Sequence, residues 1–244
     1  EDVKLVYDTF YHPENMFLTL TGNFNPYEMA CLVEDNLSKK KFGKYLNPII
    51  IKENEPKKVT TKYKEEYINV TYPRLKFSIK MDMSRFKNYS SLELKILTSL
   101  LFNINFGATS DFKDELMEKG LIQNMNVTCD VYDDTFVVTI NVTSNFKEEI
   151  IKKVKEKLEN LSISELDFKR KKNATIATLI LDYEDLENVS YRIQDDVLNN
   201  GGIVTNLKEI LEDETIDDLK NIIDLLDFDN ISINVFLPKE NQKE

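Results

Sequence analysis

Residues 10–24 of the chain read Phe10-Tyr11-His12-Pro13-Glu14-Asn15-Met16-Phe17-Leu18-Thr19-Leu20-Thr21-Gly22-Asn23-Phe24. Met16–Thr21 is rich in residues that fit a pleated sheet, and it stops at Gly22-Asn23, so it predicts a β-strand. Asn25-Pro26-Tyr27-Glu28 is typical of a helix start, because Asn caps free N–H groups and Pro suits the first turn. The helix is expected to run from Pro26 to Lys41. The segment therefore predicts a strand followed directly by a helix.

The chain beyond residue 65 contains both strand patterns and helix patterns. Leu75 to Met81 alternates apolar and polar residues, as a strand with one buried face does. A helix is predicted from the Ser90-x-x-Glu93 capping box onward, and it is apolar nearly all round, which indicates a central position. Further strands are expected at 67–70, 124–132, 136–142 and 231–235, and further helices at 110–119, 145–158, 162–198 and from 215. This mixture predicts an α+β fold.

Residues 43–65 interrupt these patterns. Pro48, Pro56 and the polar run between them are typical of a surface linker. We therefore expect a domain boundary here.

Composition excludes several classes of protein. Of the 244 residues, 41% are apolar, and the net charge of −11 would repel a phosphate backbone, so no nucleic-acid partner is expected. No apolar run approaches the roughly 18 residues that span a bilayer, so no membrane partner is expected. Cys31 and Cys129 are too few for a disulfide scaffold and indicate reduced, buried thiols in a cytoplasmic protein. The chain opens with Glu1-Asp2 instead of Met, which suggests a processed or excised piece of a longer protein.

Residues able to build a self-contained active site are scarce. A catalytic zinc usually takes three protein ligands, mostly His or Cys, and His12 is the one histidine in the sequence. Its position between Tyr11 and Pro13 predicts a hydrogen-bonding role in a turn. The glycine-rich phosphate loops are also missing. The residues alone therefore predict no catalytic residue, no metal ligand and no cofactor site in this chain.

Residues 10–24 resemble a motif of the insulinase/pitrilysin family of zinc peptidases, in which Tyr-x-Pro-x-Asn-Met precedes an apolar strand and a Gly. Phe106–Leu116 is similar to the small-residue turn and helix of the family's second domain, and Glu118-Lys119-Gly120-Leu121 is similar to the segment that follows it. The resemblance is greatest to small bacterial, processing-peptidase-like members. It implies two homologous α+β domains, each a mostly antiparallel sheet backed by helices.

Two departures from the family pattern limit what the resemblance implies. The family's inverted zinc motif, His-x-x-Glu-His with a distal Glu, would lie before residue 1, so zinc is expected in the missing N-terminal half. Active members often carry an Arg and a Tyr around the Glu-Lys-x-Gly-Leu stretch to hold substrate. The matching positions here are Met117 and Gln123, which supply neither the charge nor the phenol.

The resemblance implies the following organisation and function. Residues 1–42 are the last strand and helix of the first domain, 43–65 the linker, 66–238 the second, non-metal-binding domain, and 239–244 a tail. The chain would be the C-terminal half of a zinc endopeptidase and form the non-catalytic wall of a chamber for unfolded or extended peptides. The alternative is a non-catalytic partner subunit or scaffold that lacks protease activity even at full length. A homodimer or a related subunit remains open as a partner.

Overall fold

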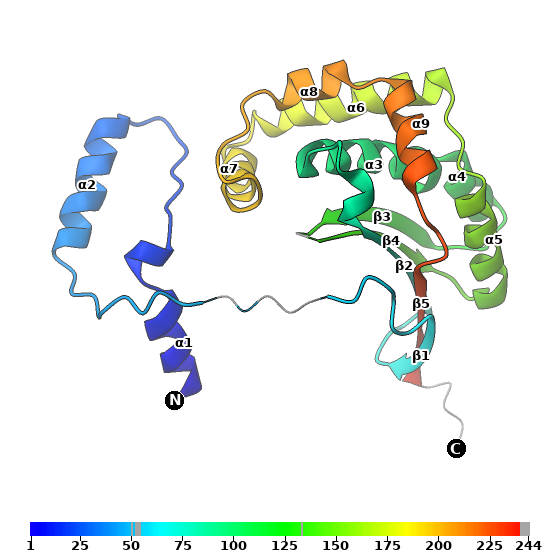
Figure 1. The fold of residues 1–244 in the computed structure, drawn as a ribbon, viewed down its shortest axis with the longest axis horizontal. Helices are drawn as coiled ribbons and strands as arrows, with labels where there is room; N and C mark the ends of the chain where they lie inside the picture. Colours follow the sequence, from blue (N-terminus) through cyan, green and yellow to red (C-terminus); the bar gives the residue numbers. More distant parts are fainter. Residues whose placement is uncertain (50, 52–54, 133, 240–244) are drawn as a thin grey trace. The chain divides into compact units, whose positions relative to one another are not determined.

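The computed structural model describes residues 1–49, 51, 55–132 and 134–239 (Figure 1). The chain divides into two compact units. Unit 1 comprises Glu1–Asn54 and Leu179–Thr205, and unit 2 comprises Glu55–Thr178 and Asn206–Glu244.

Unit 2 is built on a five-stranded sheet with strand order β1-β5-β2-β4-β3. The strands are β1 (Tyr63–Ile68), β2 (Arg74–Asp82), β3 (Asn124–Val131), β4 (Thr135–Thr143) and β5 (Ile231–Pro238). β2 pairs antiparallel with both β4 and β5, and β3 pairs antiparallel with β4. Only the β1–β5 pair among these is parallel. The predicted α+β class, with a mostly antiparallel sheet, is confirmed.

Helices cover one side of this sheet (Figure 1). They are α3 (Ser91–Phe106), α4 (Asp111–Glu118), α5 (Lys147–Glu159) and α9 (Ile216–Leu225). α3 begins with the predicted capping box, in which Ser90 and Glu93 satisfy each other's backbone N–H groups. Leu94, Leu97 and Leu101 of α3 are buried in the same cluster as Phe77 of β2. The core of unit 2 therefore lies between the sheet and these helices.

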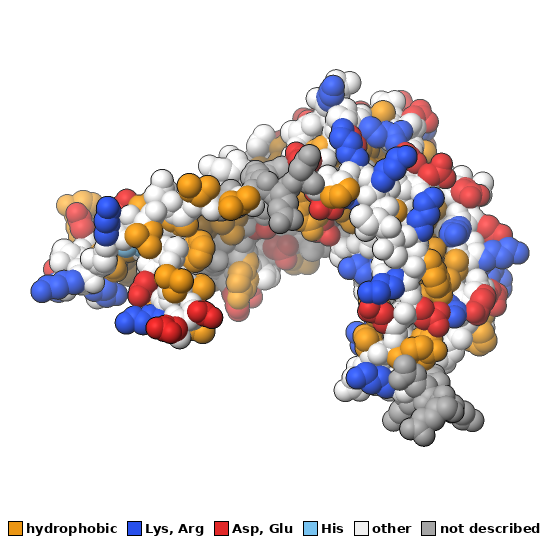
Figure 2. All heavy atoms as spheres, turned by 60° about the horizontal axis from the view of Figure 1, so that its bottom comes forward, with side chains coloured by type: hydrophobic (Ala, Val, Ile, Leu, Met, Phe, Trp, Pro, Cys, Tyr) orange, Lys and Arg blue, Asp and Glu red, His pale blue; other side chains and the backbone are white. Residues whose placement is uncertain are grey.

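Unit 1 contains α1 (Asp2–Phe10), α2 (Pro26–Ser38) and α7 (Leu186–Asn200), and α6 (Glu165–Asp182) contributes residues to both units. None of the residues of α1 or α2 is buried. Most of the large hydrophobic side chains that stay exposed belong to this unit, for example Leu18 at 64% and Leu32 at 60% exposure. Figure 2 shows them spread over the surface of the part at the left, which carries α1 and α2.

Several elements differ from the sequence-based predictions. Met16–Thr21 is extended but is not part of a sheet in the described structure, because a strand forms only where a partner offers backbone groups. The single helix expected at 162–198 is two helices, because Asp185 caps the N-terminus of α7. Helices α1 and α8 (Leu207–Asp213) were not predicted.

The start of unit 2 is fastened to the sheet by one amide side chain. Asn230, just before β5, accepts a hydrogen bond from the Val59 N–H at 2.8 Å. Its Nδ2 donates to the carbonyls of Lys57 and Lys80 at 2.8 and 2.7 Å. Asn230 thus joins residues 57–59 to the end of β2.

We expect Asn230→Ala to destabilise unit 2 by about 1–3 kcal/mol, because it leaves three backbone groups without their partner. Hydrogen exchange at the Val59 amide should rise, and urea unfolding should shift to lower concentration. Asn234→Ala is the matched control, because Asn234 in β5 makes only a side-chain contact to Ser232 at 3.3 Å. Equal losses in the two variants would contradict this assignment.

Candidate functional site

The sheet of unit 2 has two chemically different faces. Leu75, Phe77, Ile79 and Met81 of β2 are buried beneath the helices. The residues between them, from Arg74 to Asp82, point to the opposite face, because side chains alternate along a strand. None of the described helices of unit 2 packs on that second face (Figure 1). We call it the open face.

The open face is lined mainly by amide, hydroxyl and charged side chains. The strand register places the following residues on it: Lys64, Glu66, Ile68, Arg74, Lys76, Ser78, Lys80, Asp82, Asn124, Asn126, Thr128, Asp130, Thr135, Val137, Thr139, Asn141, Thr143, Ser232, Asn234, Phe236 and Pro238. Asn141 Nδ2 donates to Asn126 Oδ1 at 3.0 Å across the β4–β3 pair. Such a surface offers many hydrogen-bond donors and acceptors to a polar ligand, and little apolar area.

Strand β3 is an edge of the sheet. The hairpin closes with the Tyr132 N–H donating to Thr135 O at 2.7 Å. The register then directs the N–H and C=O groups of Met125, Val127, Cys129 and Val131 away from β4. Lys113 of α4 donates to Met125 O at 2.9 Å. Among the described residues, the outward backbone groups of the other three have no protein partner, so an extended peptide could pair with them.

The two positions that match the family's substrate-holding pair, and that depart from it in residue type, lie at the entrance to β3. Met117 is in the last turn of α4 and is 47% exposed. Gln123 is also exposed, and its N–H donates to Thr143 O at 2.9 Å. Between them, Gly120 takes a positive φ of 67°, which ends the helix. The segment therefore leads from α4 into the edge strand, as its position in the resemblance implies.

The sequence did not reveal the other members of this surface. Lys113 follows Ser110 by helix-start spacing, and nothing in that pattern indicates that it caps a carbonyl of β3. The side chains of β2 that face away from the core could be read from its alternation. Their neighbours on β4 and β5 could not, because pairing between distant strands is not visible in a single sequence.

The donors in the described residues do not fit a zinc ion. No group of three His, Cys, Asp or Glu residues is arranged to hold a metal there. His12 has both ring nitrogens near backbone groups: Nδ1 accepts from the Glu14 N–H at 3.3 Å, and Nε2 lies 3.2 Å from Gly43 O. The prediction that His12 fixes a turn is confirmed.

The cysteines offer no prepared nucleophile either. Cys129 is buried beside Thr98 and Ser99 of α3, and burial raises the pKa of its thiol to about 12, so it stays protonated at neutral pH. Cys31 is exposed, contrary to the expectation that both thiols are buried, and neither cysteine forms a disulfide.

One carboxyl group has a strongly altered acidity. Burial raises the pKa of Glu214 to about 7, and the negative charges of Asp218 and Glu93 add to the effect. The Lys172 ammonium opposes it, and Lys172 Nζ donates to the Glu214 carbonyl at 2.7 Å. Glu214 ends α8 beside the Thr215–Asp218 capping box of α9. This carboxyl group lies in a helix junction, away from the open face.

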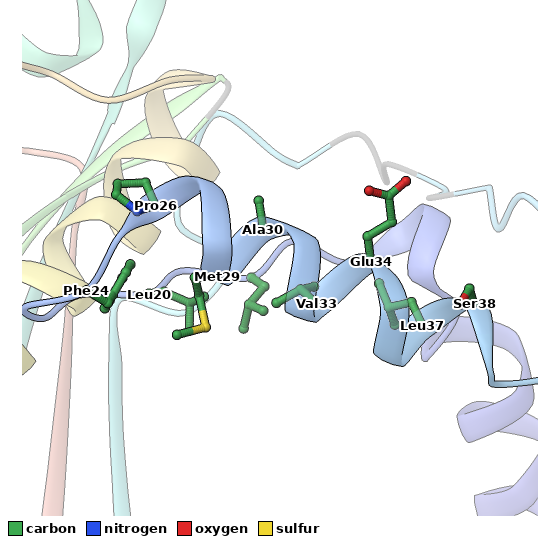
Figure 3. A pocket seen from close by; sticks show the side chains of 10 residues that line it. Leu20, Phe24, Pro26, Met29, Ala30, Val33, Glu34, Leu37 and Ser38 are labelled. Atoms are coloured by element: carbon green, nitrogen blue, oxygen red, sulfur yellow. The ribbon is translucent and has the colours of Figure 1, made fainter.

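Unit 1 carries an apolar groove of about 630 Å³ (Figure 3). Its lining residues are Leu18, Leu20, Phe24, Pro26, Met29, Ala30, Val33, Glu34, Leu37 and Ser38. Figure 3 shows Met29, Val33 and Leu37 projecting from one side of α2. These three residues are spaced four apart, so they form an apolar stripe along the helix. In the structure the stripe faces a groove instead of a packed core.

The described helices give no sign of a membrane segment: none is both long and apolar enough to cross a bilayer.

Comparisons with known proteins show where the fold recurs. Residues 1–175 match the family described as the peptidase M16 inactive domain. The chain is 33% identical over 119 residues to the uncharacterized zinc protease YmfH of Bacillus subtilis (strain 168). This matched stretch covers 48% of this chain and 27% of the relative.

Two solved structures are similar in fold. An M16-like peptidase from Alicyclobacillus acidocaldarius matches with a TM-score of 0.81 and 20% identity, over 97% of this chain and 57% of that one. A protease from Helicobacter pylori matches with a TM-score of 0.79 and 18% identity, over 97% of this chain and 59% of that one. The chain therefore spans a little over half the length of these structures.

The raised pKa of Glu214 predicts how stability depends on pH. The folded state holds this proton more tightly than the unfolded state, whose pKa is near 4.5. The resulting stabilisation is complete below that value and is lost as pH rises through about 7. We expect Glu214→Gln to be about 1 kcal/mol more stable than the parent at about pH 8, and no more stable at about pH 4.

Urea unfolding at the two pH values measures this difference. Glu209→Gln makes the same change of charge on an exposed position of α8 and serves as the control. The assignment fails if the two variants show the same pH dependence.

Proposed function

Because the chain belongs to the peptidase M16 inactive-domain family, we propose that it is the C-terminal half of a zinc-dependent endopeptidase and forms the non-catalytic wall of its peptide-binding chamber. The family match over residues 1–175 carries this proposal, and it confirms the resemblance drawn from residues 10–24. The open face and the unpaired edge of β3 supply the surface on which an extended peptide would lie.

The zinc in this proposal is bound by residues upstream of Glu1 in the full-length protein. The described residues contain no suitable set of ligands, and the relative YmfH is named a zinc protease. A half that lacks the metal can still raise the rate, because holding an extended peptide across a metal site replaces a diffusional encounter with a fixed geometry.

The groove of unit 1 fits the same proposal. Residues 1–42 would be the last elements of the first domain, with Met16–Thr21 joining a sheet and Met29, Val33 and Leu37 packing on it. Burying each such side chain contributes roughly 1.5–3 kcal/mol, so leaving them exposed is costly. The partial coverage of the solved relatives supports this reading, because their chains are longer than this one.

The alternative proposal is a non-catalytic partner subunit or scaffold of the same fold. It is favoured by Met117 and Gln123, since neither side chain supplies a positive charge or a phenol to hold substrate. As such a subunit or scaffold, the chain would bind an unfolded or extended peptide, a second copy of itself, or a related subunit. The upstream sequence discriminates: an inverted His-x-x-Glu-His motif supports the peptidase, and its absence supports the subunit. In either case we propose a cytoplasmic location, because two free cysteines fit a reducing compartment.

One test of this proposal distinguishes a role in binding the catalytic metal from a role in positioning the substrate. Purified chain 1–244 with added zinc should cleave no unstructured peptide, because His12 is its one histidine and no suitable ligand set accompanies it in the part of the chain that the structure describes. Deleting residues 66–244 from the full-length protein should abolish peptide turnover while zinc stays bound upstream. Undiminished turnover after the deletion would overturn the chamber-wall proposal.

Another test of this proposal concerns the edge of β3. Val127→Pro removes one outward N–H and leaves the hydrogen bonds to β4 in place, because proline is tolerated where the N–H faces away from the ladder. We expect this variant to bind an extended peptide about tenfold more weakly, a loss of roughly 1.4 kcal/mol. Fluorescence anisotropy with a labelled neutral peptide measures it.

Val127→Ala is the matched control, because it loses packing but keeps the N–H. Thermal unfolding of both variants establishes that the fold survives. Equal affinity in Val127→Pro and Val127→Ala would show that β3 does not pair with peptide.

A further inference from the structure

Most charged side chains on the open face are neutralised by a neighbour. Lys64 pairs with Glu66, Lys80 with Glu55, and Lys57 with Asp82. Arg74 and Lys76 are different, because neither has an acidic partner within 4.0 Å among the described residues. Both side chains are exposed. A chain with a net charge of −11 thus presents two unpaired positive charges side by side at the centre of one face.

The surroundings of these two cations are neutral. The register places Arg74 between Phe236 of β5 and Thr143 of β4, and Lys76 between Asn234 and Asn141. A row here is a set of residues that pair across neighbouring strands. Asp130, the acidic residue of β3 on this face, pairs with Val137 of β4, which pairs with Lys80 of β2, so it lies in another row than Arg74 and Lys76. The acidic residue in these two rows is Glu66 of β1, which lies beyond Phe236 and is paired with Lys64. Asn141 and Asn234 each use one N–H for a side-chain hydrogen bond, and each keeps its amide oxygen and a second N–H for a ligand.

We propose that Arg74 and Lys76 bind an acidic stretch of an extended peptide. The inference rests on the proposed function, and it names the class of substrate that the open face selects. The two cations stand at alternate positions of one strand, which are about 6.6–6.8 Å apart. Carboxylates at alternate positions of an extended peptide have the same repeat. The Arg74 guanidinium can grip one of them through two parallel hydrogen bonds.

An acidic peptide fits this face better than a nucleic acid. Both ligands are anionic, but a phosphate backbone requires a broad basic surface, and the open face offers two unpaired cations within an acidic protein. The amide side chains of Asn141 and Asn234 match the donors and acceptors of a peptide backbone.

The test measures the affinity of chain 1–244 for three labelled peptides of equal length that alternate Thr with Glu, Gln or Lys. Fluorescence anisotropy is recorded at an ionic strength of about 0.15 M, where long-range repulsion is screened. The Glu peptide should bind roughly fivefold more tightly than the Gln peptide, since exposed ion pairs contribute modestly. Arg74→Gln with Lys76→Gln should remove that preference.

Lys155→Gln with Lys169→Gln is the matched control. This variant also loses two positive charges, but from exposed helical positions of unit 2. Its preference for the Glu peptide should survive. Equal binding of the Glu and Gln peptides would overturn the inference and leave peptide binding intact. Binding of none of the three peptides would overturn the proposed function as well. A single-stranded oligonucleotide that bound as tightly as the Glu peptide would also overturn the inference.

Discussion

The burial of one side of β2 determines the rest of unit 2. β2 is the central strand of the sheet and pairs antiparallel with β4 and β5, so its alternation sets which side chains of those two strands face the core. Leu75, Phe77 and Ile79 are essentially inaccessible to water. A shift of one residue in the pairing would exchange these side chains with the polar ones between them. The same constraint that builds the core therefore also fixes which polar side chains reach the open face.

Local patterns in the sequence were sufficient to predict those helices and strands that a short stretch of residues specifies by itself. The capping box at Ser90 and the alternation of β2 located α3 and the core strand. The parallel pairing of β1 with β5 could not be predicted, because it joins residues far apart in the chain. Met16–Thr21 has the composition of a strand, but composition cannot supply the partner that completes it. For the candidate site, the sequence located Met117 and Gln123 beside β3, and the alternation of β2 indicates that Arg74 and Lys76 face away from the core. It missed the contact of Lys113 with β3 and the neighbours of Arg74 and Lys76 on β4 and β5, because these depend on how distant segments pair.

The two units differ in how far their large apolar side chains are buried. In unit 2 the large side chains of the core are buried, and Figure 2 shows mostly polar and charged side chains over the part at the right. In unit 1 neither α1 nor α2 contains a buried residue. Its order comes from local contacts, such as the ring of His12 stacked on Tyr45 with centroids 5.1 Å apart. The cooperativity of folding should therefore be concentrated in unit 2, where the hydrophobic driving force is largest.

The burial of Cys129 gives the protein an intrinsic chemical probe. The thiol sits on the edge strand and touches α3, so an alkylating reagent reaches it only when β3 separates from that helix. Cys31 on α2 is exposed and reacts without any such opening. A single labelling time course thus contains a fast phase that reports the accessible thiol. Its slow phase gives the free energy of opening at the edge where peptide would pair, without the introduction of a foreign group.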